Sequence, residues 1–183
     1  MSQQTTLQSL PLSTERTLIR QASIDDAAFF LELMTSEGWL KNIGDRGIYT
    51  LADAEAHVQN NILKSYQDNG FGMYVICGPQ GDAIGSAGFI DRPTLEHVDI
   101  GYAFLPHAFG QGYAIEACRC VYQYGVEQLE IKPVVAITAS DNERSGNLLL
   151  KLGFKRLADI CLPDSGESVH YYVDQQHPEY PRH

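Results

Sequence analysis

One stretch, residues 100–117, constrains the fold of this chain more than any other. Its first part, from Ile100 to Pro106, predicts a strand, and a tight turn built around Gly110 and Gly112 follows. An amphipathic helix is then predicted to open at about Gly112. A strand, a glycine turn and a helix start together direct several backbone N–H groups and the positive end of a helix dipole at one spot. Such a spot is suited to bind a phosphate.

The rest of the sequence predicts one domain in which strands and helices are mixed. Apolar residues at helical spacing, preceded by Ser23, Thr50 and Asn142 as N-caps, predict three helices besides the one at Gly112. The predicted helices cover about residues 24–34, 51–68, 112–128 and 142–152. The predicted strands cover about residues 17–20, 71–77, 83–90, 96–105, 133–138, 154–160 and 168–174. We therefore expect the α/β (α+β) class, with a mixed, mostly antiparallel central sheet of about six or seven strands flanked by about four helices.

Both ends of the chain and one internal stretch are predicted to be irregular. Residues 1–13 are interpreted as a polar N-terminal tail, residues 14–175 as a single domain and residues 176–183 as a frayed C-terminal tail. The stretch from Glu37 to Gly47 holds three glycines and is expected to be a loop. Trp39 in that loop either faces a substrate groove or anchors the loop.

Charge and composition argue against several classes of partner. The formal net charge of -10 disfavours nucleic acid and anionic membranes as the main partner. The charge agrees with a cationic substrate such as an amine, and solubility alone explains it equally well. No apolar run approaches the roughly 20 residues that cross a bilayer, and the polar start lacks the features of a signal peptide. The expected location is the cytoplasm.

The cysteines and histidines show no metal-binding pattern. The 4 cysteines form no Cys-x-x-Cys pair, and Cys118 and Cys120 point to different sides of a predicted helix. The 6 histidines show no ligand spacing. We expect reduced thiols and no bound metal.

Three classes of phosphate ligand compete for the glycine turn. A Walker A loop needs Gly-Lys-Ser/Thr after its glycines, and Gln111-Gly112-Tyr113 supplies neither the lysine nor the residue that binds magnesium. A dinucleotide fingerprint needs a third glycine where Ile115 stands, and an acidic residue about 20 positions further on, where Lys132 stands. Both nucleotide classes are therefore disfavoured. The third class is coenzyme A.

The residues around this turn resemble the GNAT acetyltransferases. His107-x-x-Gly110-x-Gly112 stands where that family carries Gln/Arg-x-x-Gly-x-Gly/Ala. The string from Ile100-Gly101-Tyr102 to Glu116-Ala117 is more similar to one branch, the ribosomal-protein alanine N-acetyltransferases of the RimJ/RimL type. The same branch is resembled by Asp141-Asn142-x-x-Ser145, by Lys151-Leu152-Gly153-Phe154 and by the opening Thr14-Glu15-Arg16-Thr17-Leu18-Ile19-Arg20. The resemblance covers about Thr14 to Val173, nearly the whole chain.

The resemblance implies direct transfer of an acetyl group from acetyl-CoA to a primary amine. The implied acceptor is a protein N-terminus, a peptide or a small-molecule amine. The oligomeric state stays open between a monomer and a homodimer. A splayed pair of strands would form the acyl-CoA cleft, where a backbone amide near Tyr102 or Phe104 polarises the thioester carbonyl. The implied cofactor contacts are Tyr102, Phe104, Leu105, Phe109, Gly110, Gln111, Gly112, Tyr113, Ala114, Asn142 and Ser145.

Two positions depart from the family pattern. His107 replaces the Gln or Arg that opens the signature, so only backbone contacts to the phosphates are expected there. Leu149 stands where many members of the family carry a tyrosine as general acid for the leaving thiolate. Two alternatives to the enzyme therefore stay open: a non-catalytic acyl-CoA sensor or interaction module, and a nucleotide-binding protein.

The acceptor amine must lose a proton before it attacks the thioester. An α-amine, with a pKa of about 7.7–8, needs less help than a lysine at about 10.4. The candidate bases are Asp99 and Glu96 on the central strand, with His97 as a further candidate. Alternation along that strand places Asp99 on the face opposite the apolar side chains. If Asp99 is not the base, it is a solvated or salt-bridged carboxylate. Tyr171 and Tyr172 in the last hairpin are predicted either to line the acceptor groove or to pack in the core.

Overall fold

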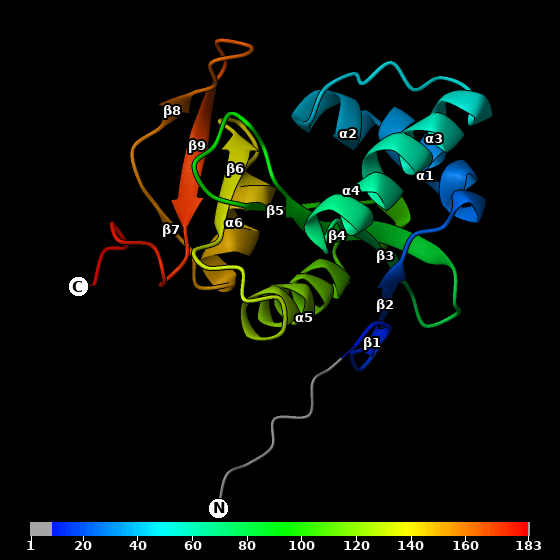
Figure 1. The fold of residues 1–183 in the computed structure, drawn as a ribbon, viewed down its shortest axis with the longest axis horizontal. Coiled ribbons are helices and arrows are strands. Elements are labelled where there is room, and N and C mark those ends of the chain that lie inside the picture. The colour runs from blue at the N-terminus through cyan, green and yellow to red at the C-terminus, as the bar shows by residue number, and fades with distance from the viewer. Residues whose placement is uncertain (1–8, 183) are drawn as a thin grey trace, which may run out of the picture.

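A mixed sheet forms the centre of the protein, and the predicted α+β class is confirmed (Figure 1). The computed structural model describes residues 9–182, and within them nine strands join in the order β1-β2-β3-β4-β5-β6-β9-β7, with β8 paired to β9. Neighbouring strands are antiparallel except β5 and β6, which run parallel. The strands are β1 (Leu12–Ser13), β2 (Leu18–Gln21), β3 (Met73–Cys77), β4 (Ala83–Ile90), β5 (Asp99–Phe104), β6 (Val135–Ala139), β7 (Lys155–Arg156), β8 (Ile160–Cys161) and β9 (Ser168–Val173).

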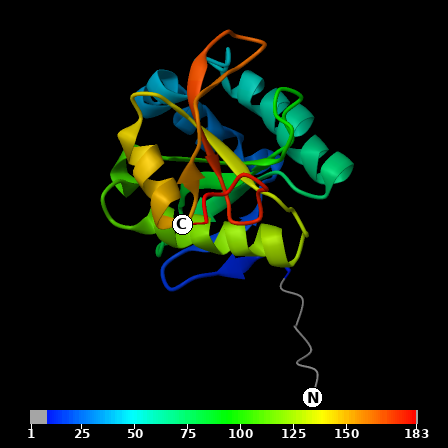
Figure 2. The same ribbon diagram turned by 90° about the vertical axis from the view of Figure 1, so that its left-hand side faces the viewer.

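Helices cover both faces of this sheet, with α5 and α6 on one side and α1 to α4 on the other (Figures 1 and 2). The helices are α1 (Ala27–Thr35), α2 (Glu37–Asn42), α3 (Leu51–His57), α4 (Lys64–Asn69), α5 (Tyr113–Glu127) and α6 (Glu143–Lys151). A π-helical segment, η2 (Val58–Leu63), joins α3 to α4 without a break. Short 3-10 turns precede α1 (η1, Ile24–Asp26) and follow β5 (η3, Pro106–Ala108).

The predicted N-caps explain where the helices begin. Thr50 Oγ1 accepts a hydrogen bond from the Asp53 amide at 3.2 Å, while the Asp53 carboxylate accepts one from the Thr50 amide at 2.9 Å. Asn142 Oδ1 accepts from the Ser145 amide at 3.2 Å. Near Ser23, whose amide donates to the Asp26 carboxylate at 2.8 Å, the chain first forms the 3-10 turn and then α1.

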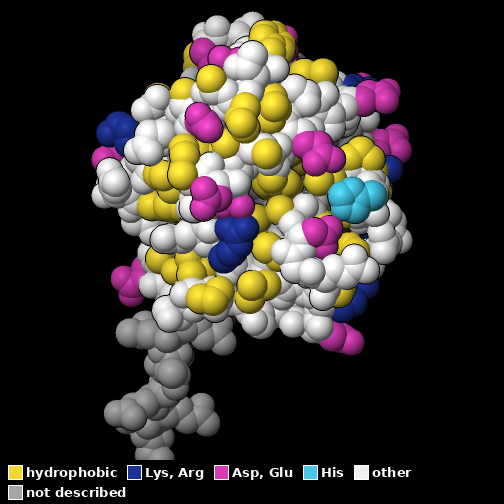
Figure 3. All heavy atoms as spheres, turned by 90° about the vertical axis from the view of Figure 1, so that its right-hand side faces the viewer, with side chains coloured by type: hydrophobic (Ala, Val, Ile, Leu, Met, Phe, Trp, Pro, Cys, Tyr) yellow, Lys and Arg dark blue, Asp and Glu magenta, His cyan; other side chains and the backbone are white. Residues whose placement is uncertain are grey.

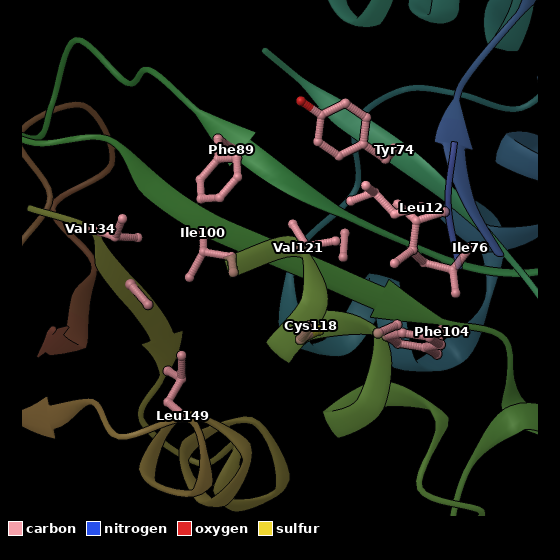
Figure 4. Packing of buried hydrophobic residues seen from close by; sticks show 14 of the residues in the cluster. Leu12, Tyr74, Ile76, Phe89, Ile100, Phe104, Cys118, Val121, Val134 and Leu149 are labelled. Carbon is pink, nitrogen blue, oxygen red and sulfur yellow. The ribbon is translucent and has the colours of Figure 1, made fainter. Parts of the chain in front are cut away.

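Two hydrophobic clusters hold the layers together. One packs α5 and α6 onto the sheet through side chains such as Phe89, Ile100 and Val121 (Figure 4). The other packs α1 and the α3–η2 helix onto the opposite face through Leu33 and Val75, which are 1% and 0% exposed. Each buried side chain of this size contributes about 1.5–3 kcal/mol to folding, so both layers are stably fixed to the sheet.

Four predictions about the elements were wrong in detail. The stretch from Glu37 is not all loop: α2 occupies Glu37–Asn42, because the Ser36 hydroxyl caps it by accepting from the Trp39 amide. The strand predicted over 96–105 begins only at Asp99, and the strand predicted over 154–160 is split into β7 and β8. The predicted polar tail contains β1, where Leu12 is buried and pairs with Ile19. The rest of that tail, residues 1–8, lies outside the described residues.

The segment after β9 also packs against the protein, where fraying was predicted. His177 is 6% exposed and its ring lies edge-on to the His97 ring, with centroids 5.2 Å apart. The Tyr180 hydroxyl donates to the Gly153 carbonyl at 3.1 Å, and Lys155 lies over the Tyr180 ring. These contacts attach the C-terminal segment to the end of α6. Among the described residues, no helix is both long enough and apolar enough to cross a membrane.

Candidate active site

The sheet opens in the middle, between β5 and β6. On one side β5 is paired with β4 along its whole length, from Gly85–Phe104 to Ile90–Asp99. On the other side its register with β6 consists of Asp99–Val135, next to a hydrogen bond from the Val135 amide to the Val98 carbonyl at 3.0 Å. Beyond this point the two strands diverge. A cleft of about 1540 Å³ fills the opening and is lined by residues 99–104 of β5 and 136–139 of β6. The expected splayed strand pair is therefore present.

The volume of the cleft exceeds what a single small ligand needs. Pockets for one such ligand are typically about 300–1,000 Å³. The cleft runs from the start of α5 and α6 on one side of the sheet to α1, α2 and α3 on the other. It therefore has room for a cofactor and a second substrate. We call these two parts the cofactor half and the acceptor half.

The glycine turn forms the outer end of the cofactor half. Gly110 and Gly112 have φ angles of 75° and 80°, a left-handed conformation that residues with a Cβ adopt at a cost. Gly112 is the N-cap of α5 and has no side chain to satisfy the first amides. Within residues 9–182, no protein acceptor takes the backbone N–H groups of residues 110–115. These groups, together with the helix dipole, form an anion site that is open to the cleft.

A brace from the N-terminal segment holds this turn in place. Glu116 in α5 accepts hydrogen bonds from the Thr14 hydroxyl at 2.6 Å and from the Arg16 amide at 2.7 Å. The Arg16 guanidinium forms an ion pair with Glu116 at 2.7 Å and donates to the Gln111 carbonyl at 2.8 Å. The carbonyl of the turn thus faces Arg16, which leaves its amides directed toward the cleft.

The structure brings most of the predicted cofactor contacts together along one wall. Those that line the cleft are Tyr102, Phe104, Phe109, Gly110, Gly112, Ala114, Asn142 and Ser145. Three do not line it. Leu105 is 2% exposed and packs in the core under α1, which corrects its assignment. The side chain of Gln111 turns back to the His107 carbonyl, and the ring of Tyr113 lies under Arg16, so these two offer only their backbone amides.

A pair of hydroxyl groups connects β5 with α6 beside the cleft. The Tyr102 hydroxyl lies 2.8 Å from Ser145 Oγ and donates to the Ser145 carbonyl at 3.0 Å. Burial raises the pKa of Tyr102 well above its ordinary value, so the phenol keeps its proton at every physiological pH. Leu149, at the position where the family often has a tyrosine, is 0% exposed and points into the core (Figure 4). Leu149 therefore offers no proton to a substrate.

Two cofactor-half residues were missed by the sequence analysis. Thr138 in β6 lines the cleft and is 6% exposed, and its buried hydroxyl has no hydrogen-bond partner among the described residues. An unsatisfied buried hydroxyl costs about 1–3 kcal/mol, which favours a ligand that pairs with it. Arg144, at the start of α6, stacks on Phe109 with its guanidinium carbon 4.4 Å from the ring centre. Both residues line the cleft at the side of the glycine turn. Nothing in the local sequence distinguishes them.

Asp99 lies where the two strands part, and it is the predicted base that the structure places in the cleft. Its side chain is almost fully buried, and the Arg92 guanidinium donates to it at 2.9 Å. Burial raises the pKa of Asp99 to about 6, and the nearby charge of Arg92 opposes the rise. The alternation along β5 is confirmed: Ala103 and Leu105 pack toward α1 and α3, while Ile100 and Phe104 pack toward α5. Asp99 shares the face of Ala103 and therefore borders the acceptor half.

The other catalytic candidates lie elsewhere. Glu96 is exposed in the turn before β5 and does not line the cleft, and neither does His97, which packs on His177. The early strand start predicted at Glu96 was the cause of this error. Tyr171 lies against His177, and Tyr172 is 5% exposed in the core. Neither lines the cleft, so of the two alternatives considered for these tyrosines the structure favours packing.

The acceptor half is formed by α1, α2, the loop after α2, and α3 with its π-helical extension. Trp39 does both of the things considered for it, since it lines the cleft and packs against the cluster under α1. The polar residues that line this half are Ser36, Lys41, Asn42, Arg46, Asp53, His57, Asn60 and Asn61. Within residues 9–182 no group of three or more His, Cys, Asp or Glu side chains could hold a metal ion.

Comparison with known proteins agrees with this geometry. The family model described as Acetyltransferase (GNAT) domain matches residues 16–155. The N-acetyltransferase YnaD of Bacillus subtilis, itself described as uncharacterized, is 27% identical over 166 residues, which cover 88% of this chain and 95% of the relative. YoaA of the same organism, also described as an uncharacterized N-acetyltransferase, is 25% identical over 146 residues, 79% of this chain and 82% of its own length.

Solved structures have the same fold. The ribosomal-protein-S5-alanine acetyltransferase from Vibrio fischeri superposes with a TM-score of 0.77 at 15% identity, covering 94% of this chain and 100% of that chain. RimL, described as a ribosomal L7/L12 alpha-N-protein acetyltransferase in complex with coenzyme A, gives a TM-score of 0.75 at 20% identity, covering 89% and 96%. The chain belongs to the GNAT family of acetyltransferases. It is an acetyl-CoA-dependent N-acetyltransferase that acts on an amine.

Proposed function

We propose that this enzyme transfers acetyl directly from acetyl-CoA to a primary amine while both substrates are bound, as in the RimJ/RimL-type branch of the family. The observation that carries the proposal is the set of unpaired amides at residues 110–115, at one end of a cleft that continues through the sheet. The diphosphate of the cofactor would bind these amides. The coenzyme A named in the RimL structure supports this assignment. The pantetheine arm would then run along β5 toward the point where the strands part.

The cofactor half supplies groups that suit the pantetheine and the thioester. The unpaired Thr138 hydroxyl would pair with an amide of the pantetheine arm, and the carboxamide of Asn142 lies on the same wall. A free β5 amide at the opening would polarise the thioester carbonyl, a contact worth about 3 kcal/mol in the transition state. The Tyr102 hydroxyl would turn its single proton from the Ser145 carbonyl to the departing thiolate, and so would act in place of the tyrosine that Leu149 replaces.

Asp99 would serve as the base on the opposite face of the sheet. With a pKa of about 6 the carboxylate is mostly ionised at pH 7 and yet more basic than an ordinary aspartate. The amine nitrogen would lose its proton to Asp99 and attack the thioester carbon, forming the amide N–C bond. The C–S bond then breaks, and the thiolate takes up a proton, so that amide and free coenzyme A result. The amine and the cofactor thus approach the reaction centre from opposite sides.

Two measurements test this function. Isothermal titration with acetyl-CoA, NAD and ATP should give binding for acetyl-CoA alone, whereas a nucleotide-binding protein would prefer NAD or ATP. Release of free thiol from acetyl-CoA, followed with a panel of small amines, amino acids and N-terminal peptides, should show amine-dependent turnover. Tight acetyl-CoA binding without turnover on any amine would instead support a sensor or interaction module.

A further inference from the structure

The acceptor half of the cleft has a corner that is rich in hydrogen-bond donors. Its side chains come from the loop after α2, where Arg46 lies, and from the helix α3–η2, which contributes His57, Asn60 and Asn61. Lys41, in the last turn of α2, lines the same part of the cleft. None of these residues has a role in the cofactor half. They are therefore placed to bind a second group of the acceptor molecule, apart from its amine.

Three polar residues of the helix that runs through α3 and η2 line the cleft. Within η2 (Val58–Leu63), Val58 and Ile62 are 0% and 3% exposed and pack against α1. His57, Asn60 and Asn61 are spaced i, i+3 and i+4, so they lie on one side of the helix and line the cleft together. Such π turns are frequent at functional sites.

The hydrogen bond between Asn61 and His57 fixes which ring nitrogen carries the proton. The amide nitrogen of Asn61 lies 2.9 Å from His57 Nδ1, and an amide nitrogen can only donate. Nδ1 therefore accepts, and the proton of the neutral ring is on Nε2. Burial and the nearby charge of Arg46 lower the pKa of His57, so the ring stays neutral at pH 7. His57 thus offers an N–H donor and has no protein acceptor for it within residues 9–182.

Within residues 9–182, the two positive charges of this corner form no ion pair with the protein. Among the described residues neither Lys41 nor Arg46 forms an ion pair or a side-chain hydrogen bond. Of the nearby acids, Asp53 is engaged by the amides of residues 49 and 50, and Asp99 by Arg92. Glu167 lines the cleft from the turn between β8 and β9. Carboxylate side chains are scattered over the face of the molecule shown in Figure 3.

We infer that the acceptor is an amine that also carries an anionic oxygen group, a carboxylate or a phosphate, bound by Arg46, the His57 Nε2–H and the Asn60 amide. This inference rests on the proposed function and specifies its substrate class. Lys41 adds to the local positive potential, and Asn61 is a positioning residue that holds the His57 ring. A charged, hydrogen-bonded contact of this kind discriminates by about tenfold or more. The amine of the same molecule would lie toward Asp99.

The test compares acceptors that differ in the anionic group. Thiol release is measured with L-tyrosine, L-tyrosine amide and tyramine, and with phosphoethanolamine and ethanolamine as the phosphate pair. The peptide pair is Ala-Asp-Ala and Ala-Asn-Ala, both with an amidated C-terminus, so that they differ only in the side-chain carboxylate. We expect kcat/KM to be about tenfold or more higher for the anionic member of at least one set. The set that shows the preference identifies whether the group is a free carboxylate, a phosphate or a peptide side chain.

Variants then assign the preference to this corner. Arg46→Gln should raise KM for the preferred anionic acceptor about tenfold with little change in kcat, and leave the neutral partner and acetyl-CoA unaffected. Asn61→Leu should weaken the same preference, and Asn61→Gln should restore part of it. Lys64→Gln is the control for the loss of charge. Lys64 lies outside the cleft, in α4, which continues the helix that holds Asn61.

The outcomes separate this inference from the proposed function. Turnover with equal kcat/KM for anionic and neutral acceptors, or an equal loss for both in Arg46→Gln, overturns the inference and leaves the transferase proposal intact. The absence of turnover on every amine overturns the transferase proposal and the inference with it.

Discussion

The two halves of the cleft are built from different kinds of group. The cofactor half relies on backbone amides of a short continuous segment, residues 110–115, at the start of one helix. The acceptor half relies on side chains that several elements present within residues 34–61, from the end of α1 to the π-helical segment. Backbone chemistry requires a local conformation, which glycine spacing specifies. A side-chain site requires the completed fold, and it can change its specificity without disturbing the cofactor.

Gly112→Val is the substitution that should separate the halves most sharply. A branched residue resists the φ of 80° and places a Cβ 3.2 Å from the Arg16 guanidinium, which displaces the amides of the turn. We expect the Kd for acetyl-CoA, measured by calorimetry, to rise roughly 100-fold. Gly81→Val, at a φ of 85° in the β3–β4 hairpin, is the matched control and should leave Kd unchanged. A folded Gly112→Val protein with normal affinity would contradict the placement of the diphosphate.

Asp99→Asn tests whether acetyl transfer depends on the carboxylate at the point where β5 and β6 part, between the two halves of the cleft. We expect kcat/KM to fall about 100-fold and the acidic limb of its pH profile, with an apparent pKa of about 6, to disappear. Acetyl-CoA affinity should be unchanged. Glu96→Gln is the control, since that carboxylate is exposed outside the cleft. An unchanged profile in Asp99→Asn would assign the proton to another group.

The stability of the same variant gives an independent reading of the Asp99 pKa. Because folding raises this pKa to about 6, the folded state binds the proton more tightly than the unfolded state. The contribution of Asp99 to stability is therefore fully present below about pH 4 and is lost as pH rises through about 6. Thermal unfolding of the wild type and Asp99→Asn between pH 4 and 8 should show this difference. If the unfolding temperatures of the wild type and the variant change in parallel with pH, folding does not raise the pKa of Asp99.

Thr138→Val should stabilise the fold and weaken the binding of acetyl-CoA. The hydroxyl lacks a partner in the protein, so its removal should raise the unfolding free energy without ligand by about 1 kcal/mol. The same change should weaken acetyl-CoA binding about fivefold, because the cofactor loses a hydrogen bond. Ser86→Ala provides the contrast: its hydroxyl donates to the Tyr74 carbonyl at 2.9 Å, so stability should fall and affinity should not change. A loss of stability in Thr138→Val would mean that the hydroxyl is already satisfied.

Arg144→Gln should give the smallest effect, confined to the cofactor half. The exposed guanidinium, which stacks on Phe109 beside the glycine turn, would lie near the phosphates of the cofactor under the proposed function. Its loss should therefore raise the Kd for acetyl-CoA about threefold at low salt. The difference from the wild type should shrink at 0.5 M salt. Arg119→Gln, an exposed position of α5 outside the cleft, should show no such change. An equal rise in Kd at both positions would indicate that the net charge of the protein matters, and not a local interaction between Arg144 and the cofactor.

The sequence predicted the fold well, for physical reasons that are local. Glycines in left-handed conformations and N-caps such as Thr50 and Asn142 act over a few residues, so their effects are visible in the chain itself. Strand alternation placed Asp99 correctly on its face, but it could not show that burial raises the pKa of its carboxyl to about 6. It also could not show which face of β9 borders the opening, so both alternatives stayed open for Tyr172, which packs in the core. The orphan hydroxyl of Thr138 depends on the divergence of two strands, which no local pattern records.

The brace on the glycine turn has a consequence for how the protein acquires activity. Thr14 and Arg16 reach Glu116 across sequence separations of 102 and 100 residues. Contacts of such high contact order form late in folding, after the local helices and hairpins. In refolding experiments, binding of coenzyme A should therefore recover later than the helical circular dichroism signal. The glycine turn is held in its binding conformation only after the N-terminal segment has docked on α5.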